Sequence, residues 1–309
     1  MENSTQPSPD LESPHPWYWA TRMIIAVITV IGNGVVIAVI SCSRRLRNQP
    51  NMFILSLAIA DFSVGLFITP TGFICLRLVQ CDPRIQAVFF NALLHASMAN
   101  LLTLTIDRLL AVTYPLRYRT LVTGFRMAVG VAAAWVIPFV VCAVRLAWLY
   151  SDRESTRNVE KVYKPFMDVA LGALPCVIIV TSYAYILLTV HKIHVQTKSL
   201  IAHVRFNGNN SRINLARERE SRSPLIKSSI RVLGVVVAFF VVCYTYNMYV
   251  SFCSVYSLCV VSQITKDVSL ILIFANSAVN FFVYAFLKTD FRETLNASLL
   301  GIFQYCFRV

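Results

Sequence analysis

The residue with the clearest capacity for chemistry is Asp61, a lone carboxylate inside a long uncharged stretch. Other uncharged stretches carry Ser97 and, at helical spacing, Asn276, Ser277 and Asn280. Residues 276 and 280 lie one helical turn apart and share a face with residue 277. An ionisable side chain in an apolar segment is costly and normally has partners. These oxygen-bearing groups suit a hard monovalent cation or water, and a hydrogen-bonded polar core without an ion explains them equally well.

A second candidate is the pair Asp107-Arg108, which ends the uncharged stretch Ile85–Ile106. A lone charge pair at a helix end most simply marks the boundary between membrane and water. On spacing alone, the pair therefore indicates a boundary and no particular function.

These residues must be positioned by membrane-spanning helices. Seven stretches run nearly without charge, and a hydrocarbon core of about 30 Å needs roughly 20 apolar residues per helix. The hydrophobic content of 57% and the mean hydropathy of +0.63 agree. The sequence therefore predicts an all-α membrane protein, a seven-transmembrane helix bundle. The stretches are Met23–Ser43, Asn48–Leu76, Ile85–Ile106, Met127–Val144, Val169–Val190, Val232–Thr265 and Val268–Leu287.

The segments between the stretches differ in charge. Most of the 28 Lys and Arg residues fall in alternate segments, including the polar residues 193–227, which are expected to form a long cytoplasmic loop. Because Lys and Arg in short loops favour the cytoplasmic side, the sequence predicts an extracellular N-terminus and a cytoplasmic C-terminus. The net charge of +13 then faces anionic membrane lipid and cytosolic partners, and it gives no reason to expect nucleic acid.

The two ends of the chain frame a transmembrane domain at residues 17–288. Residues 1–16 are polar and Pro-rich, which predicts a disordered extracellular tail without a signal peptide, and Asn3 is a glycosylation sequon. Residues 289–309 are expected to form a short amphipathic helix and a cytoplasmic tail. In that tail Cys306 is either a palmitoylation site or a free thiol.

Short motifs occur in order along the seven stretches. They are Gly32-Asn33-Gly34-Val35-Val36, Leu55-Ser56-Leu57-Ala58-Ile59-Ala60-Asp61, Asp107-Arg108-Leu109 with Pro115-Leu116-Arg117-Tyr118, Trp135, Pro175 with Tyr183, Phe240, Asn280-Phe281-Phe282-Val283-Tyr284 and Lys288-Thr289-Asp290-Phe291-Arg292. Each motif alone is weak, but all of them in this order resemble rhodopsin-like (class A) G-protein-coupled receptors. The resemblance implies a receptor of the cell membrane, not an enzyme, that binds an extracellular ligand within the bundle and activates a heterotrimeric G protein.

The resemblance also implies roles for the candidate residues. The allosteric sodium pocket of the family corresponds to Asp61, Ser97, Asn276, Ser277 and Asn280, and no other metal or cofactor is expected. Asp107 would hold Arg108 in the inactive state, and Arg108 would contact the G protein in the active state. The activation switch is expected to comprise Asp107, Arg108, Tyr183, Phe240, Tyr244 and Tyr284.

Two proline hinges of the family are missing. Tyr246 stands in place of the sixth-helix proline, Phe281 in place of the seventh-helix proline, and Tyr244 in place of the sixth-helix tryptophan. Because prolines kink helices, the switch is expected to be stiffer or differently biased. A non-signalling receptor relative is therefore an alternative. A secondary transporter is less favoured, because the chain shows no two related halves.

The cysteines depart from the family pattern as well. Residues 145–168 contain no cysteine, so the family's bridge between the third helix and the second external loop cannot form. The candidates for external disulfides are Cys75, Cys81, Cys253 and Cys259, and spacing alone leaves their pairing open.

The ligand cavity implied by the resemblance lacks the carboxylate that amine receptors of the family carry in the third helix. Amine receptors of the family carry an Asp where this chain has Phe90. The matched positions are mostly apolar and aromatic with a few neutral polar groups, which favours a small or lipid-like ligand over a cationic amine. Among them, His95 is either a ligand contact or a satisfied core histidine. The expected lining is Phe90, Asn91, Leu94, His95, Met167, Leu171, Tyr244, Asn247, Met248, Ser251, Leu270 and Phe274.

Overall fold

A computed structural model describes residues 16–79, 81–151, 154–206, 234, 237–254, 256–287 and 293. The regular elements in these ranges are helices. They are α1 (Pro16–Cys42), η1 (Arg44–Leu46), α2 (Gln49–Ser63), η2 (Val64–Ile68), α3 (Thr69–Arg77), α4 (Pro83–Thr113), α5 (Tyr118–Leu121), α6 (Gly124–Val144), η3 (Arg145–Ala147), α7 (Glu154–Met167), η4 (Asp168–Ala173), α8 (Leu174–Phe206), the sixth span (Val237–Ser254) and α10 (Gln263–Leu287).

Some sequence expectations fall on residues that the structure does not describe. They are Asn3 and the tail before Pro16, residues 207–227 of the long loop, the side chain of Tyr284, and Cys306 with the amphipathic helix apart from Glu293.

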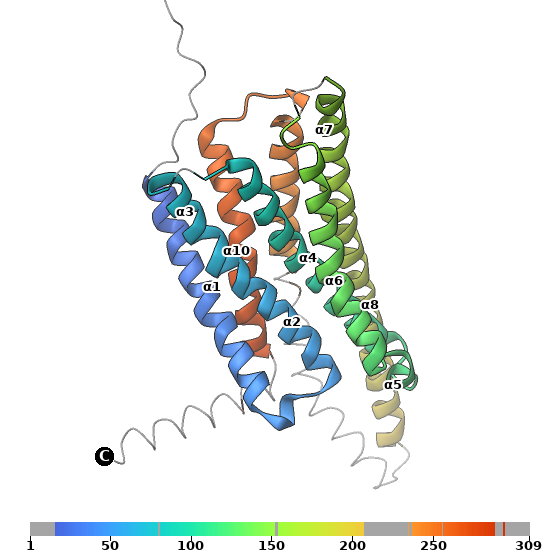
Figure 1. Ribbon diagram of the computed structural model, residues 1–309. Helices are drawn as coiled ribbons and strands as arrows, with labels where there is room; N and C mark the ends of the chain where they lie inside the picture. The colour runs from blue at the N-terminus through green and yellow to red at the C-terminus, as the bar shows by residue number, and fades with distance from the viewer. Residues whose placement is uncertain are drawn as a thin grey trace, which may run out of the picture.

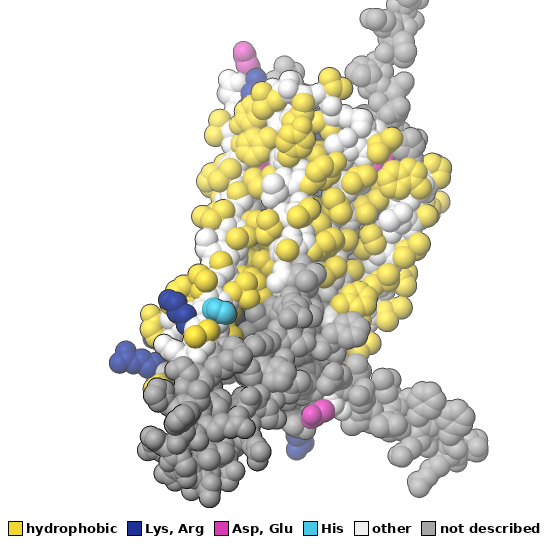
Figure 2. All heavy atoms as spheres, turned by 180° about the vertical axis from the view of Figure 1, so that it is seen from behind, with side chains coloured by type: hydrophobic (Ala, Val, Ile, Leu, Met, Phe, Trp, Pro, Cys, Tyr) yellow, Lys and Arg dark blue, Asp and Glu magenta, His cyan; other side chains and the backbone are white. Residues whose placement is uncertain are grey.

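The seven-helix expectation is confirmed. Within the described ranges, seven helices are long and apolar enough to cross a membrane. Figure 2 shows apolar side chains covering the visible face of the bundle, with Lys, Arg and His side chains at its lower end. The spans are Pro16–Cys42, Asn51–Cys75, Pro83–Thr113, Gly124–Ala147, Asn158–Ile193, Val237–Ser254 and Gln263–Phe282.

Helix α4 lies at the centre of the bundle. It packs against α2, α6 and α8, whereas α1 packs against α2 and α10 (Figure 1). The largest apolar cluster joins α1 and α2 through Val36, Ile40, Leu57 and Ala58, with Leu104 of α4 beside them. In lipid such contacts act mainly through close van der Waals packing, because the surrounding acyl chains are as apolar as the side chains.

Local sequence explains where several helices begin. The Asn48 side chain accepts a hydrogen bond from the Asn51 amide at 3.1 Å, and the Asp82 side chain accepts one from the Arg84 amide at 2.7 Å. Each cap is followed by a proline within the first helical turn, where the missing N–H costs nothing. The second and third spans therefore begin close to where the sequence places them.

Two spans contain a wider π-helical turn, and each turn ends just before a proline. The turn η2 precedes Pro70, and η4 precedes Pro175. A proline ring clashes with the carbonyl four residues earlier, and here that carbonyl lies inside the widened turn. The prolines thus reshape the outer parts of the second and fifth spans, and η4 sets the direction of residues from Asp168 onward.

Three boundaries differ from the sequence expectation. The external segment 145–168 was expected to be a loop, but α7 occupies most of it and continues through η4 into the fifth span. The loop expected at about 193–227 begins as helix, because α8 continues to Phe206 without a glycine or proline to stop it. The stretch Val232–Thr265 is not one span, since the sixth span ends at Ser254 and α10 begins at Gln263.

Helices α1 and α10 approach closely where a glycine faces an aromatic ring. A Cβ atom added to Gly32 would lie 2.6 Å from the Phe281 ring, whereas one added to Gly34 would lie 3.5 Å from Phe62. The family's proline position is therefore filled by a ring that rests directly on the backbone of α1. Only glycine leaves room for that ring at position 32.

This packing predicts opposite results for two similar substitutions. Gly32→Ala should lower the thermal unfolding midpoint of the purified receptor, since overpacking costs about 1–3 kcal/mol. Gly34→Ala is the control, and it should be neutral or stabilising because alanine is favoured over glycine in a helix by about 1 kcal/mol. Equal midpoints for the two variants would contradict this packing.

Candidate functional site

Asp61 lies fully buried at the meeting point of three helices. Its Oδ1 accepts a hydrogen bond from the Ser97 hydroxyl of α4 at 2.5 Å, and its Oδ2 accepts one from Asn280 Nδ2 of α10 at 2.9 Å. The side chain of Ser277 also contacts the carboxylate. Four of the five residues assigned to the ion pocket therefore lie together, whereas the buried Nδ2 of Asn276 has no hydrogen-bond partner in the described part of the chain.

Further polar groups extend this cluster toward α1. Asn33 Nδ2 donates to the Ser277 carbonyl at 3.1 Å and to the Thr29 carbonyl at 3.0 Å. Its buried Oδ1 has no partner among the described residues. Asn33 belongs to a motif that the sequence displays, but its link to α10 could not be predicted from that motif.

A second buried polar cluster lies one layer away on α4. The Ser56 hydroxyl donates to Asn100 Oδ1 at 2.6 Å and accepts from Trp135 Nε1 at 3.1 Å. Asn100 Nδ2 in turn donates to the Ala96 carbonyl at 2.8 Å. These bonds join α2, α4 and α6. The available sequence signal was Ser56 and Asn100, two polar residues inside apolar spans.

At the other end of α4 the structure pairs Asp107 with Arg108, with 3.7 Å between Asp107 Oδ2 and Arg108 Nε. The Tyr118 hydroxyl of α5 donates to Asp107 Oδ1 at 2.6 Å. Burial, together with this bond to a carboxylate, raises the pKa of Tyr118 far above its usual range, so Tyr118 remains a donor. Sequence reasoning missed the role of Tyr118, although Tyr118 ends the quoted loop motif.

The remaining switch residues lie along α8 and the sixth span. Tyr183 is buried, and a Cβ atom added to Gly234 would lie 3.0 Å from its hydroxyl. The rings of Phe240 and Tyr244 pack with their centroids 4.5 Å apart. Phe240 in turn contacts the cluster of Met98 and Ile179. The fifth and sixth helices thus meet through aromatic side chains.

A cavity of about 340 Å³ opens at the end of the bundle opposite Asp107. Because the sequence predicts that this end is extracellular, the cavity is called the outer cavity below. Six of the twelve expected ligand positions line it: Asn91, His95, Met167, Asn247, Ser251 and Leu270. The other six do not. Three of them, Phe90, Leu94 and Phe274, pack in the apolar cluster of Val64, Ile68 and Leu93. Tyr244 packs on Phe240, and Leu171 faces a groove outside the bundle. Met248 is not among the residues that line the cavity.

The cavity is more polar than the sequence predicts. Charged side chains reach it from segments that were interpreted as external: Glu160 and Lys164 from α7, Asp168 from η4, Arg145 from η3 and Lys266 from α10. Asp168 is partly buried, and its Oδ2 accepts a hydrogen bond from the Ser251 hydroxyl at 2.6 Å. The charged lining residues are Arg145, Glu160, Lys164, Asp168 and Lys266. This lining differs from the mostly apolar and aromatic one, with a few neutral polar groups, that the sequence predicts for the ligand site.

Two neutral side chains in the lining have defined hydrogen-bonding roles. His95 Nδ1 lies 2.7 Å from the Asn91 carbonyl, and because a carbonyl only accepts, Nδ1 carries the proton. In the neutral ring this leaves Nε2 as an acceptor. The Ser269 hydroxyl donates to Asn247 Oδ1 at 2.9 Å, so the Asn247 amide nitrogen keeps its two donors.

Helix α7 covers the cavity and is held by charge and aromatic contacts. Glu160 Oε1 lies 2.6 Å from Arg145 Nη2, and Glu160 Oε2 accepts from Trp148 Nε1 at 3.0 Å. Trp148 also packs edge-on against Tyr163, with 5.0 Å between ring centroids. Glu160 therefore joins α7 to the end of α6.

The same segment is bonded to the start of α4. Arg84 Nη1 donates to the Leu149 carbonyl at 3.0 Å, and the Tyr150 hydroxyl donates to Asp82 Oδ2 at 2.8 Å. The Arg84 amide, with the Tyr150 hydroxyl, holds the pKa of Asp82 below its usual value, so this carboxylate remains an acceptor at neutral pH. These bonds connect the two segments that the family joins by a disulfide.

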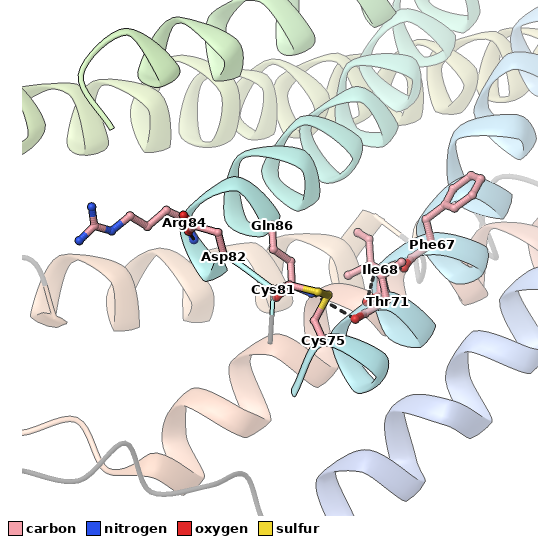
Figure 3. Close-up of a disulfide and its surroundings, with 8 residues drawn as sticks. All are labelled: Phe67, Ile68, Thr71, Cys75, Cys81, Asp82, Arg84 and Gln86. Carbon is pink, nitrogen blue, oxygen red and sulfur yellow. Dashed lines mark hydrogen bonds between the residues drawn. A yellow bond between two sulfur atoms is a disulfide. The ribbon is translucent and has the colours of Figure 1, made fainter. Parts of the chain in front are cut away.

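The external cysteines pair within their own loops. Cys75 is bonded to Cys81 and Cys253 to Cys259. Figure 3 shows the first bridge beside Gln86, whose Nε2 donates to the Thr71 carbonyl at 3.3 Å. Both disulfides therefore close short loops and leave α7 without a covalent tie.

Arg22 is a buried cation that sequence reasoning placed outside the first span. It is 5% exposed, and its guanidinium carbon lies 4.4 Å from the Phe274 ring centroid of α10. Nη1 donates to the Tyr18 hydroxyl at 2.8 Å, while Nε and Nη2 have no hydrogen-bond partner among the described residues. An intramembrane ionisable residue of this kind is a candidate functional group by default. It escaped notice because the uncharged stretch begins one residue later.

The described residues thus form a seven-span bundle with a polar cavity at one end, a buried carboxylate at mid-depth and a charge pair at the other end. Residues 32–284 match the family described as 7 transmembrane receptor (rhodopsin family). The chain belongs to this family and is a multi-pass membrane protein and a G-protein-coupled receptor, not an enzyme.

Similar proteins within the family bind different ligands. The chain is 30% identical to the histamine H2 receptor of Cavia porcellus over 288 residues, which cover 87% of this chain and 76% of that receptor. It is 30% identical to the Homo sapiens histamine H2 receptor over 287 residues, covering 87% and 75%. It is 29% identical to the adenosine receptor A2b of Rattus norvegicus over 321 residues, covering 93% and 90%.

The contacts of Glu160 generate a prediction about α7. Glu160→Gln keeps the shape of the side chain but removes its charge, so amide hydrogen exchange in residues 154–167 should become roughly two- to five-fold faster, as expected for a partly exposed ion pair worth about 0.5–1 kcal/mol. Lys161→Gln is the control, because Lys161 is exposed on the same helix. Equal exchange in the two variants would show that the Arg145–Glu160 pair does not hold α7.

Proposed function

We propose that this receptor binds a small polar ligand in the outer cavity through Asp168 and activates a heterotrimeric G protein through Arg108. The observation that supports the ligand assignment most strongly is the Asp168 carboxylate among the lining residues. Only its Oδ2 is used by Ser251 in the hydrogen bonds described, so the group can accept further bonds. A carboxylate in a partly enclosed site favours a cationic group or a strong N–H donor.

The other lining groups narrow the ligand chemistry. His95 Nε2 would accept a hydrogen bond, and the Asn247 amide nitrogen would donate one. A fitting ligand therefore carries an ammonium or amino group for Asp168, a second donor for His95 and an acceptor for Asn247. The volume of about 340 Å³ lies at the small end of ligand cavities.

This ligand class revises the expectation from sequence. The argument against a cationic amine rested on Phe90, but Asp168 offers a carboxylate from a different helix. A lipid-like ligand fits poorly, because five charged side chains line the cavity. The relatives are receptors named for histamine and adenosine, which are both small molecules with nitrogen donors and acceptors, and this supports the proposal.

The signalling half of the proposal rests on the inner end of α4. Asp107 engages both Arg108 and Tyr118, an arrangement that suits a resting state. Ligand binding would favour a second state in which Arg108 leaves Asp107 and faces the G protein. We also propose that the receptor lies in the plasma membrane with its N-terminus outside, as the distribution of Lys and Arg favours.

The test is a screen of biogenic amines and nucleosides with a promiscuous G-protein readout. For a ligand found in this way, Asp168→Asn should lower potency at least tenfold, since hydrogen bonds to charged groups contribute about 1.5–3 kcal/mol. Arg108→Ala should abolish the response while radioligand binding persists. Glu154 is an exposed residue of α7 outside the cavity lining, so Glu154→Gln should change neither the potency of the ligand nor the G-protein response.

The outcomes separate the two halves of the proposal. Unchanged potency in Asp168→Asn would remove the ligand assignment and leave the coupling assignment standing. A full response from Arg108→Ala would remove the coupling assignment. Binding without any response in the unchanged receptor would favour the non-signalling alternative.

We further propose that Asp61 binds an allosteric sodium ion. The residues around it fit a hard monovalent cation, because the carboxylate, the Ser97 and Ser277 hydroxyls and the Asn280 amide supply oxygen ligands. The partnerless Oδ1 of Asn33, on the neighbouring helix, is a further buried oxygen that water could link to an ion. Bound sodium would stabilise the conformation in which these helices meet.

Sodium binding predicts a cation-specific stabilisation that needs no ligand. The thermal midpoint of the purified receptor should rise with NaCl relative to N-methylglucamine chloride at equal ionic strength, because an ion that binds only the folded state shifts the unfolding equilibrium. Asp61→Asn should remove the difference between the two salts. A difference that persists in this variant would place the ion elsewhere, and no difference in the unchanged receptor would exclude the site.

A further inference from the structure

A groove of about 560 Å³ opens on the outside of the bundle. Helices α6 and α8 both pack on α4 but little on each other, and residues of all three line the groove, so α4 forms its floor. Small side chains keep the groove open where α4 and α6 meet. They are Ala99 and Thr103 of α4 and Gly130, Ala133 and Ala134 of α6.

The groove has one apolar and one charged end. Toward the middle of the membrane its walls are Pro138 of α6 and Leu174, Pro175 and Ile178 of α8. At the other end Arg126 lies in the first turn of α6. From Arg126 to Pro138 the helix rises roughly 18 Å, which is about the depth of one leaflet of a 30 Å hydrocarbon core.

Arg126 is held at the mouth of the groove. Its Nη1 donates to the Leu121 carbonyl at 3.1 Å and to the Thr120 carbonyl at 3.4 Å. Among the described residues, no carboxylate lies within ion-pair distance of Arg126. Asp107, the acidic residue in the groove wall, is engaged by Arg108 and Tyr118. The guanidinium therefore presents a positive charge at the interface, with N–H donors beyond those used by the two carbonyls.

We propose that this groove is a binding site for an anionic phospholipid of the cytoplasmic leaflet. One acyl chain would lie on the small residues of α4 and α6, and the phosphate or carboxylate of the headgroup would pair with Arg126. The walls belong to membrane-spanning helices, so acyl chains are what surrounds them, and the fixed cation selects among lipids by headgroup charge. This proposal depends on the orientation proposed above.

The experiment photolabels the full-length receptor in phosphatidylcholine nanodiscs. A phosphatidylserine probe with a diazirine near the end of one acyl chain is compared with a phosphatidylcholine probe of the same design. Labelled peptides are identified by mass spectrometry. The phosphatidylserine probe should label residues 99–110 and 126–138 at least five-fold more strongly than the phosphatidylcholine probe.

Two pairs of variants test the two ends of the groove. Ala133→Trp fills the groove and should lower labelling at least five-fold, whereas Ala132→Trp, on the exposed side of the same helix, should not. Arg126→Gln should remove the preference for phosphatidylserine, whereas Arg119→Gln, an exposed cation outside the lining, should retain it. The exposed position of Arg126 makes misfolding of its variant a minor concern.

Several results would overturn the site. Equal labelling by the two probes in the unchanged receptor would remove headgroup selection. Equal labelling of Ala133→Trp and Ala132→Trp would show ordinary contact with bulk lipid. A sterol probe that labels the groove in place of phosphatidylserine, or a crosslink through α6 to a second receptor, would identify a different occupant. Because photolabelling needs neither ligand nor G protein, these results do not depend on the proposed signalling function.

Discussion

The bundle depends on one constraint, which is that polar groups buried between helices in lipid must find partners inside the protein. Asp61 meets this constraint through α4 and α10, and Ser56 meets it through α4 and α6. Apolar contacts alone orient helices weakly in lipid, because acyl chains compete for the same surface. Hydrogen bonds at fixed depths set which residues face each other. The two clusters on α4 therefore determine the register of the surrounding helices, and the cavity and the switch take their places from that register.

The outer face uses a different means of fixation from the one that the family resemblance implies. A disulfide restricts a loop whatever the local charge, whereas the bonds from Asp82, Arg84 and Glu160 depend on ionised side chains near water. Such bonds are individually weak and are screened by salt. The covering helix α7 is thus held over the cavity by several small contributions. It can open locally at a lower cost than a covalently tied loop, which suits an entrance for a ligand.

Sequence reasoning succeeded where the physical signal is local. Hydropathy predicts the spans, because each helix must cross the hydrocarbon core on its own. The lone carboxylate of Asp61 predicts that other helices supply its hydrogen-bond partners. Reasoning failed where a contact depends on the three-dimensional path of the chain. Asp168 was counted as part of a loop because α7 has few apolar residues to mark it as a helix. Arg22 and Tyr118 carry no periodic signal, and the aromatic rings beside Arg22 come from α10 as well as α1.

Helix α4 carries His95 of the cavity, Ser97 of the Asp61 cluster and Asp107 of the switch within thirteen residues, roughly 18 Å of one helix. A regular helix of this length is stiff, and α4 contains neither an internal proline nor a π turn to bend it. Bending of α4 is therefore not the route by which a change at the cavity reaches the switch. Such a change must act through the helices that are bonded to α4. Ser97 bonds α4 to Asp61 of the second span, which Asn280 joins to α10, and Tyr118 bonds α5 to Asp107 of α4. Since Phe281 rests on Gly32 beside Asn280, movement of α10 at this level is coupled to α1. The sixth span packs on α4 through Phe240 and is hydrogen-bonded to α10 and η4 through Asn247 and Ser251 beside the cavity, so a ligand bound there would contact it directly.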